Sequence, residues 1–131
     1  AAALRRAAGP APPVDGAMAH MRFLHYSEVG GGLPPHVDLA RTDAAGNRST
    51  HTFILYLADC ATGGETVLLS RHDDAEDAVV ASVTPRRGRL LLFPHLCPHL
   101  ARPTSEVPKL LLRGELLRRP GAAGAAARDE A

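Results

Sequence analysis

The sequence predicts an all-β protein, a jelly-roll barrel of the double-stranded β-helix type with little helix. Three observations lead to this fold class. The middle of the chain is a row of short apolar runs rich in β-branched and aromatic residues, clusters of glycine and proline separate these runs, and no segment has the periodicity of an amphipathic helix. We expect seven or eight short strands in two packed antiparallel sheets.

Three of the predicted strands occupy the first half of the chain. Residues 21–26 form an apolar run that ends before a loop with three glycines and two prolines, and residues 50–57 form a longer run. A strand at 65–70 follows Gly63 and Gly64. We expect this glycine pair to make a tight turn, because glycine adopts backbone angles that other residues avoid.

Three further strands are predicted at 79–83, 89–93 and 109–117, and a proline lies within two residues of one end of each. An acidic run at 73–77 separates the two halves. Such runs are usually solvated loops, so we assign it no chemistry.

The two ends of the chain differ from its middle. Residues 1–17 and 119–131 are rich in alanine, proline and glycine and have little apolar periodicity, so we expect flexible segments there. The predicted folded domain is therefore 18–118. A chain of 131 residues with 45% hydrophobic residues suits one such domain.

Charge and hydropathy disfavour two classes of partner. A net charge of +1 provides no strong field for nucleic acid, and no apolar run approaches the ~20 residues that span a bilayer. We therefore expect a soluble protein that binds neither nucleic acid nor membrane. The sequence indicates no compartment and no oligomeric state.

The main clue to function is a set of potential metal ligands. His36 and Asp38 are separated by one residue, so on an extended strand both side chains point the same way and can reach one ion. His99 follows a buried-strand type of run and can supply a third ligand from elsewhere in the fold. Two imidazoles and one carboxylate that leave positions open are the ligands of non-haem Fe(II) oxygenases.

A basic residue downstream of His99 could hold an acidic co-substrate. Lys109 lies ten residues after His99, and Arg113 has the same strand parity and could hold a carboxylate with its planar fork. We favour Lys109 on spacing and keep Arg113 as the alternative.

Cysteines and one further histidine are left out of the predicted site. Cys60 and Cys97 do not make a disulfide framework, and a thiolate ligand would suit zinc better than iron. His95 and His99 would bind zinc as an HxxxH pair only on a helix, which the neighbouring prolines disfavour. We expect His95 to end a strand or to support the site from behind its ligands.

Four sequence pieces, in order, resemble the catalytic core of the 2-oxoglutarate and Fe(II)-dependent dioxygenases, in their prolyl 4-hydroxylase-like branch. The pieces are RFLHYSEVGGGLPPHVD, THTFILYLADCATGGETVLL, VTPRRGRLLLFPHLCPH and KLLLRGELL. The resemblance covers about three quarters of the chain. It implies that His36, Asp38 and His99 bind iron and that Lys109 binds the distal carboxylate of 2-oxoglutarate.

The same resemblance implies further contacts to the co-substrate. Tyr26 and Tyr56, the only tyrosines in the chain, match positions where related enzymes have a tyrosine near the co-substrate, and Thr52 is a weaker companion with the strand parity of Tyr56. The alternative for each tyrosine is a core aromatic whose hydroxyl finds an ordinary partner. No catalytic residue is predicted beyond the metal ligands.

The implied reaction is hydroxylation of a substrate C–H bond, coupled to decarboxylation of 2-oxoglutarate to succinate. It uses Fe(II), O2 and, as reductant, ascorbate. The resemblance favours a prolyl residue in a peptide or protein as substrate, and related enzymes also act on other side chains and small molecules. Two other functions stay open, a cupin-like metalloenzyme without 2-oxoglutarate and a non-catalytic jelly-roll binding module.

Overall fold

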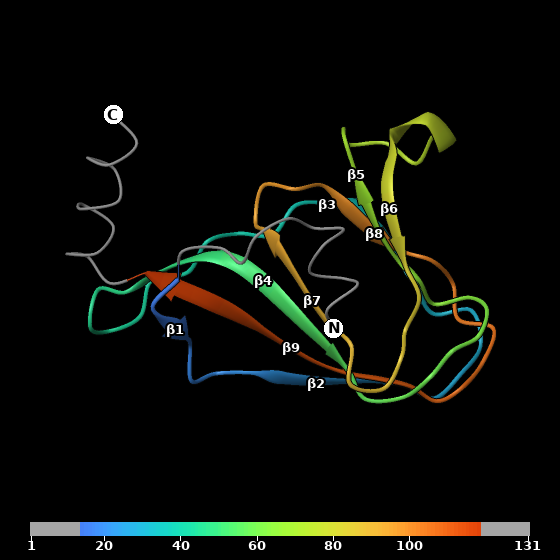
Figure 1. The fold of residues 1–131 in the computed structure, drawn as a ribbon, viewed down its shortest axis with the longest axis horizontal. Helices are drawn as coiled ribbons and strands as arrows, with labels where there is room; N and C mark the ends of the chain where they lie inside the picture. The colour runs from blue at the N-terminus through green and yellow to red at the C-terminus, as the bar shows by residue number, and fades with distance from the viewer. Residues whose placement is uncertain (1–13, 119–131) are drawn as a thin grey trace.

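Two antiparallel sheets make up the fold of residues 14–118, the part of the chain that the computed structural model describes (Figure 1). The larger sheet contains β1 (Gly16–Ala17), β2 (Arg22–Tyr26), β4 (Arg48–Tyr56), β7 (Leu90–Pro94) and β9 (Lys109–Arg118). The smaller sheet contains β3 (Leu33–His36), β5 (Thr66–Leu69), β6 (Val79–Val83) and β8 (His99–Ala101), and a 3-10 turn, η1 (Glu76–Ala78), precedes β6. The predicted jelly-roll class is confirmed.

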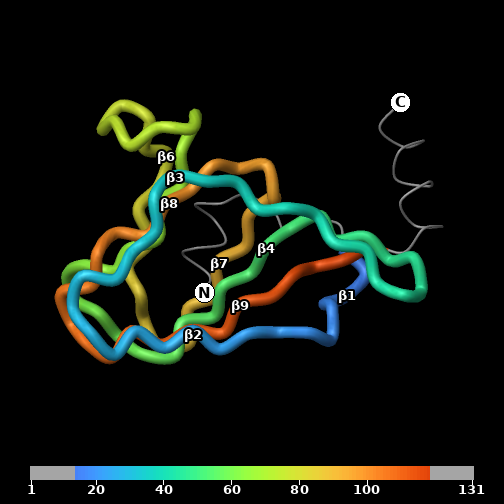
Figure 2. Tube along the Cα trace, turned by 180° about the vertical axis from the view of Figure 1, so that it is seen from behind, coloured from blue at the N-terminus to red at the C-terminus, as the bar shows by residue number. Residues whose placement is uncertain are grey.

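The strand order explains how distant parts of the sequence meet. The larger sheet runs β1-β9-β4-β7, with β2 also paired to β9, and the smaller sheet runs β3-β8-β5-β6. Figure 2 shows from behind how the chain leaves β3, passes the end of β9 and turns back into β4. This connection joins the two sheets on the side where the candidate site lies.

All six predicted strands are present within one or two residues of their expected bounds. Three strands were not predicted, β1, β3 and β8. Residues 34 and 35 in β3 are both proline, and proline cannot donate to a strand ladder. They are tolerated because β3 is an edge strand that pairs with β8 alone.

β9 is the central strand of the larger sheet. It pairs with β4 along one side and with β1 and β2 along the other. Alternation along β9 places Lys109, Leu111 and Arg113 on one face, and all three line the cavity between the sheets.

The main core fills the space between the two sheets. Its buried members come mainly from the larger sheet and are Ile54, Tyr56, Val83, Leu91, Phe93 and Leu111. A second cluster, with Val67, Leu69 and Leu100, packs against Ala78 of η1. Alternation along β5 therefore gives its even positions to the first core and its odd positions to the second.

The predicted flexible ends lie mostly outside the described residues. Of residues 1–17, the structure describes 14–17, where Gly16 and Ala17 pair with Leu117 and Leu116 of β9 as strand β1. Nothing is described of 1–13 or 119–131. Within the described range, the structure has no helix long and apolar enough to cross a membrane.

Candidate functional site

The two histidines of the predicted metal site face each other across a strand pair. His36 ends β3 and His99 begins β8, and the two residues are direct partners in the antiparallel register. Their ring centroids are 4.2 Å apart. Cross-strand partners share one face of a sheet, so this pairing alone brings together two residues that lie far apart in the sequence.

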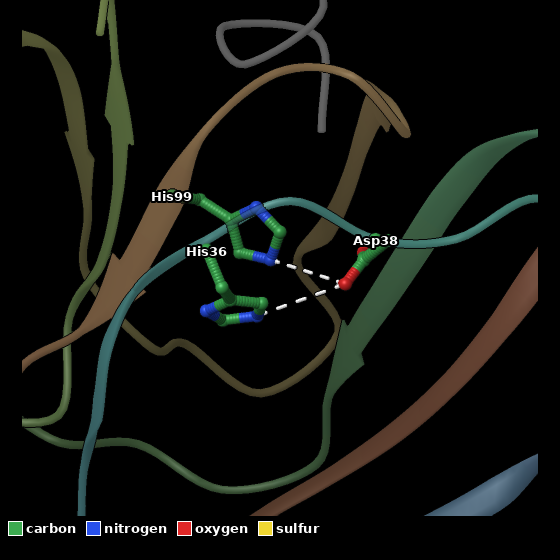
Figure 3. Close-up of side chains that lie close together, drawn as sticks. All are labelled: His36, Asp38 and His99. Atoms are coloured by element: carbon green, nitrogen blue, oxygen red, sulfur yellow. Dashed lines mark ion pairs between the residues drawn. The ribbon is translucent and has the colours of Figure 1, made fainter. Parts of the chain in front are cut away.

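Asp38 completes the group from just beyond the end of β3. Its backbone N–H donates to the carbonyl of His95 at 3.1 Å, which fixes the turn away from the strand. Its Oδ1 atom lies 3.7 Å from Nε2 of His36 and 3.6 Å from Nε2 of His99, as the dashed lines in Figure 3 mark. The three ligand atoms all lie within 4.8 Å of one another.

Backbone carbonyls fix the tautomers of both histidines. Nδ1 of His36 lies 2.8 Å from the carbonyl of Pro34, and Nδ1 of His99 lies 3.0 Å from the carbonyl of Cys97. A carbonyl only accepts, so each Nδ1 carries the proton, and in a neutral ring Nε2 keeps its lone pair. Both lone pairs point toward Asp38, the arrangement that metal-binding histidines adopt.

The charges around the site favour metal-binding protonation states. Burial opposes ionisation of Asp38, but the hydrogen bond from Thr52 and the charges of Arg113 and His99 together hold its pKa below the ordinary 3.8. Burial lowers the pKa of His99 below 6.5. At neutral pH the site therefore offers one carboxylate and a neutral His99 imidazole, which fits a divalent cation.

A cavity of about 300 Å³ opens beside these ligands and is lined by both sheets. His36, Asp38 and His99 all contribute to its wall, together with Arg113 and Lys109 from β9. Residues 109 and 113 are four apart on one strand, a separation of about 13 Å along its axis. Arg113 lies at the metal end, where its Nη2 is 2.9 Å from Oδ1 of Asp38.

Lys109 is a buried cation, with only 1% of its surface exposed. Its ammonium lies 4.8 Å from the centroid of the Tyr26 ring, and within residues 14–118 it has no ion-pair partner. Burial lowers the pKa of Lys109 below 10.5. A buried charge of this kind is costly unless an anion meets it, so the cavity is suited to a carboxylate at this end.

Tyr26 lines the cavity beside Lys109, whereas Tyr56 and Thr52 do not line it. The fully buried Tyr56 hydroxyl lies 2.5 Å from the Thr66 hydroxyl, and burial raises its pKa to about 12. Thr52 donates a 2.6 Å hydrogen bond to Oδ2 of Asp38. The predicted contacts of Tyr56 and Thr52 with the co-substrate therefore stay predictions, and the structure gives both hydroxyls protein partners.

Sequence reasoning predicted three residues that the structure brings together, His36, Asp38 and His99, but missed part of their surroundings. Thr66 lines the cavity and bonds Tyr56, and Ser49 contacts His95, which lies directly behind Asp38. Buried threonine and serine carry no sequence signal of their own. His95 was expected to support the site or to end a strand; it lies one residue beyond the end of β7 and contacts Thr52, which is hydrogen-bonded to Asp38.

Comparison with known proteins identifies the family. The sequence model of the 2OG-Fe(II) oxygenase superfamily matches residues 21–114, most of the chain. The chain belongs to this superfamily. Membership implies Fe(II), 2-oxoglutarate and O2, and the two histidines, one carboxylate and buried lysine fit that set.

One solved structure supports the placement of this 2OG-Fe(II) oxygenase. A crystal structure of a Pseudomonas putida prolyl-4-hydroxylase is similar, with a TM-score of 0.58 and 27% identity over 76% of this chain. The chain spans 50% of the length of that protein. No curated protein matches the chain significantly.

Proposed function

We propose that residues 18–118 form a dioxygenase domain that hydroxylates a substrate C–H bond while 2-oxoglutarate is converted to succinate. The observation that carries this proposal is the cavity, which has two histidine nitrogens and a carboxylate oxygen at one end and a buried ammonium toward the other. Iron would be held by His36, Asp38 and His99.

The protein residues prepare the site before any co-substrate arrives. The carbonyls of Pro34 and Cys97 hold the two imidazoles with Nε2 directed at the metal position. Three protein ligands leave coordination positions open on an octahedral ion. When bound, the iron and 2-oxoglutarate supply the oxidising chemistry, in which O2 gives one oxygen atom to succinate and one to the product while CO2 is released.

Lys109 and Tyr26 are proposed to bind the distal carboxylate of 2-oxoglutarate. The ammonium would donate charge-assisted hydrogen bonds to that carboxylate, and the co-substrate's length would then set its other end at the metal. Arg113 is the competing partner. Its contact with Asp38 places it at the metal end of the cavity, where it can meet the carboxylate nearest the iron.

The proposed substrate is a prolyl residue in a peptide or protein. The support is the similarity to the Pseudomonas putida prolyl-4-hydroxylase, of which this chain spans half. Leu39, next to Asp38 in the sequence, and Leu96, three residues before His99, are each 82% exposed. We propose that they contact the substrate, since exposed apolar side chains suit an uncharged residue better than a charged one. Ascorbate is proposed as the reductant that keeps iron in its Fe(II) state.

The test is a peptide hydroxylation assay read by mass spectrometry. The protein is incubated with Fe(II), 2-oxoglutarate, ascorbate and proline-containing peptides, and succinate is measured in parallel. We expect a gain of one oxygen on a prolyl residue and an equal amount of succinate. Oxygen on another residue type would redirect the substrate proposal but keep the reaction.

Histidine variants separate the ligand assignment from general damage to the fold. His36→Ala and His99→Ala should abolish succinate formation. His25→Ala is the matched control, because His25 is exposed on β2 and does not line the cavity. Unchanged turnover in His99→Ala, or a loss in His25→Ala equal to that in His99→Ala, would contradict the assignment.

A further inference from the structure

Behind Asp38, away from the cavity, lies a row of buried polar side chains, Thr52, His95 and Ser49, named here the support row. Their exposed fractions are 0%, 5% and 1%. None of the three lines the cavity. Thr52 is hydrogen-bonded to Asp38, His95 contacts Thr52 at 3.0 Å, and Ser49 contacts His95 at 2.8 Å. Four buried polar groups are therefore joined in one line that ends on a proposed metal ligand.

When His95 is neutral, each hydrogen bond in this line has one direction. The Asp38 carboxylate accepts, so the Thr52 hydroxyl donates to it and must accept from N–H at Nδ1 of His95. At the far end, Ser49 Oγ accepts the backbone N–H of Arg41 at 2.7 Å. Its own proton is then free to go to Nε2 of His95. A neutral imidazole with its proton on Nδ1 satisfies every member.

The line distinguishes the two oxygens of the Asp38 carboxylate. Oδ2 is engaged by Thr52 at 2.6 Å, whereas Oδ1 is the oxygen that faces both histidine Nε2 atoms and lies 2.9 Å from Nη2 of Arg113. Turning Oδ2 toward a metal would break the bond from Thr52 and leave the proton of a fully buried hydroxyl without an acceptor, although the contact with His95 would remain. Leaving a buried polar group unsatisfied costs a protein stability, so this rotation is disfavoured.

We propose that the support row positions Asp38 to bind the metal through Oδ1 alone. This inference rests on the proposed function and adds a reason for the row. With two histidines and one carboxylate oxygen as protein ligands, an octahedral ion would keep three positions open for a 2-oxo acid and O2. A carboxylate bound through both oxygens would occupy one of these three. Thr52, His95 and Ser49 are thus positioning residues, and none of them touches the reacting atoms.

The test uses Co(II) as the probe, with Thr52→Val and Thr52→Ser as the variants. Valine keeps the shape of threonine but removes the donor, and serine restores it. We expect calorimetric titration to give Thr52→Val a Kd for Co(II) about 10- to 100-fold above that of the unaltered protein, with Thr52→Ser close to the unaltered value. The visible absorption of bound Co(II), which reports coordination number, should change in Thr52→Val and be restored in Thr52→Ser.

A second threonine serves as the matched control. Thr104 is also buried, 2% exposed, and its hydroxyl bonds the backbone at Glu28 and Gly31. Thr104→Val should lose stability but keep its Kd for Co(II) and its absorption. Equal Co(II) binding by Thr52→Val and the unaltered protein would overturn the positioning role, as would an equal loss in Thr104→Val.

Failure of the wider function has a different signature. If the unaltered protein does not bind Co(II), or if His36→Ala binds it equally well, the metal site itself is wrong. If His36→Ala loses binding but Thr52→Val does not, the metal site stands and only the support row is contradicted.

Discussion

Lys109 and Tyr26 are direct partners in the pairing of β9 with β2, and the lysine ammonium lies 4.8 Å from the centre of the tyrosine ring. The ring face attracts the cation and offsets part of the cost of burying it. Lys109 is also the only lysine in the sequence. The fold thus keeps its single lysine buried against an aromatic ring, where a carboxylate can complete its environment.

Lys109→Met tests whether this buried charge exists for binding and not for stability. Methionine retains the apolar stem and removes the ammonium, so the free energy of unfolding without co-substrate should rise by about 1 kcal/mol or more. Binding of 2-oxoglutarate should be lost. Thermal unfolding with and without 2-oxoglutarate measures both effects. A destabilised variant that still gains stability from 2-oxoglutarate would contradict the proposed role.

Gly64→Ala should displace the side chain of Lys109, because the backbone of Gly64 lies against that side chain. Gly64 has a φ of +72°, and a Cβ there would lie 3.2 Å from Cδ of Lys109. We expect a loss of about 1–2 kcal/mol of stability from the left-handed conformation, together with weaker binding of 2-oxoglutarate. Gly88→Ala is the matched control, because Gly88 has a φ of +86° but open space around its Cβ position. Equal 2-oxoglutarate affinity in the two variants would show that crowding of Lys109 has no effect.

Local sequence pattern was enough to predict part of the site. The alternation expected along β9 puts Lys109 and Arg113 on one face, and both line the cavity. The spacing of His36 and Asp38 predicted convergence on one ion, and their ligand atoms are close. The reason differs from the expected shared strand, since β3 ends at His36 and Asp38 lies in the irregular segment that follows it.

Long-range pairing could not be predicted in the same way. Nothing local in a three-residue strand at His99 indicates that its partner is a proline-containing edge strand, yet this pairing sets the two histidines opposite each other. The partner of a buried hydroxyl is likewise chosen by the fold. Strand parity placed Thr52 near the site. Only the three-dimensional structure shows that its hydroxyl donates to Asp38, whereas the sequence comparison had suggested a contact with the co-substrate.

Metal-free protein should lose stability as the pH falls below about 6.5. Burial is the largest cause that lowers the pKa of His51, His95 and His99 below 6.5. Below that value the unfolded chain binds protons at these positions more readily than the folded one, so the free energy of unfolding declines as the pH drops through this range. Each histidine contributes a slope of at most about 1.4 kcal/mol per pH unit.

Urea denaturation at several pH values between about 7.5 and 5, with a chelator present, measures this slope. Asp38, whose pKa lies below 3.8, contributes only at lower pH and does not interfere. His95→Gln should flatten the dependence, because one of the three groups is removed. A free energy of unfolding that is constant or rises toward the acid end of this range would contradict the expectation.

The roles of Lys109 and Arg113 can be separated with a co-substrate that lacks one carboxylate. 2-Oxopentanoate has the 2-oxo acid group of 2-oxoglutarate but ends in a methyl group. The unaltered protein, loaded with Mn(II) to prevent turnover, should bind 2-oxoglutarate more tightly, because only 2-oxoglutarate places a carboxylate at Lys109. In Lys109→Met the two acids should bind equally. Arg113→Met, which removes the cation beside Asp38, should weaken the binding of both acids by the same factor and keep the preference for 2-oxoglutarate.

Calorimetric Kd values for the two acids, measured with the unaltered protein and the two variants, distinguish the two assignments. If Arg113→Met abolishes the preference and Lys109→Met retains it, the distal carboxylate belongs to Arg113 and the proposed assignment is reversed.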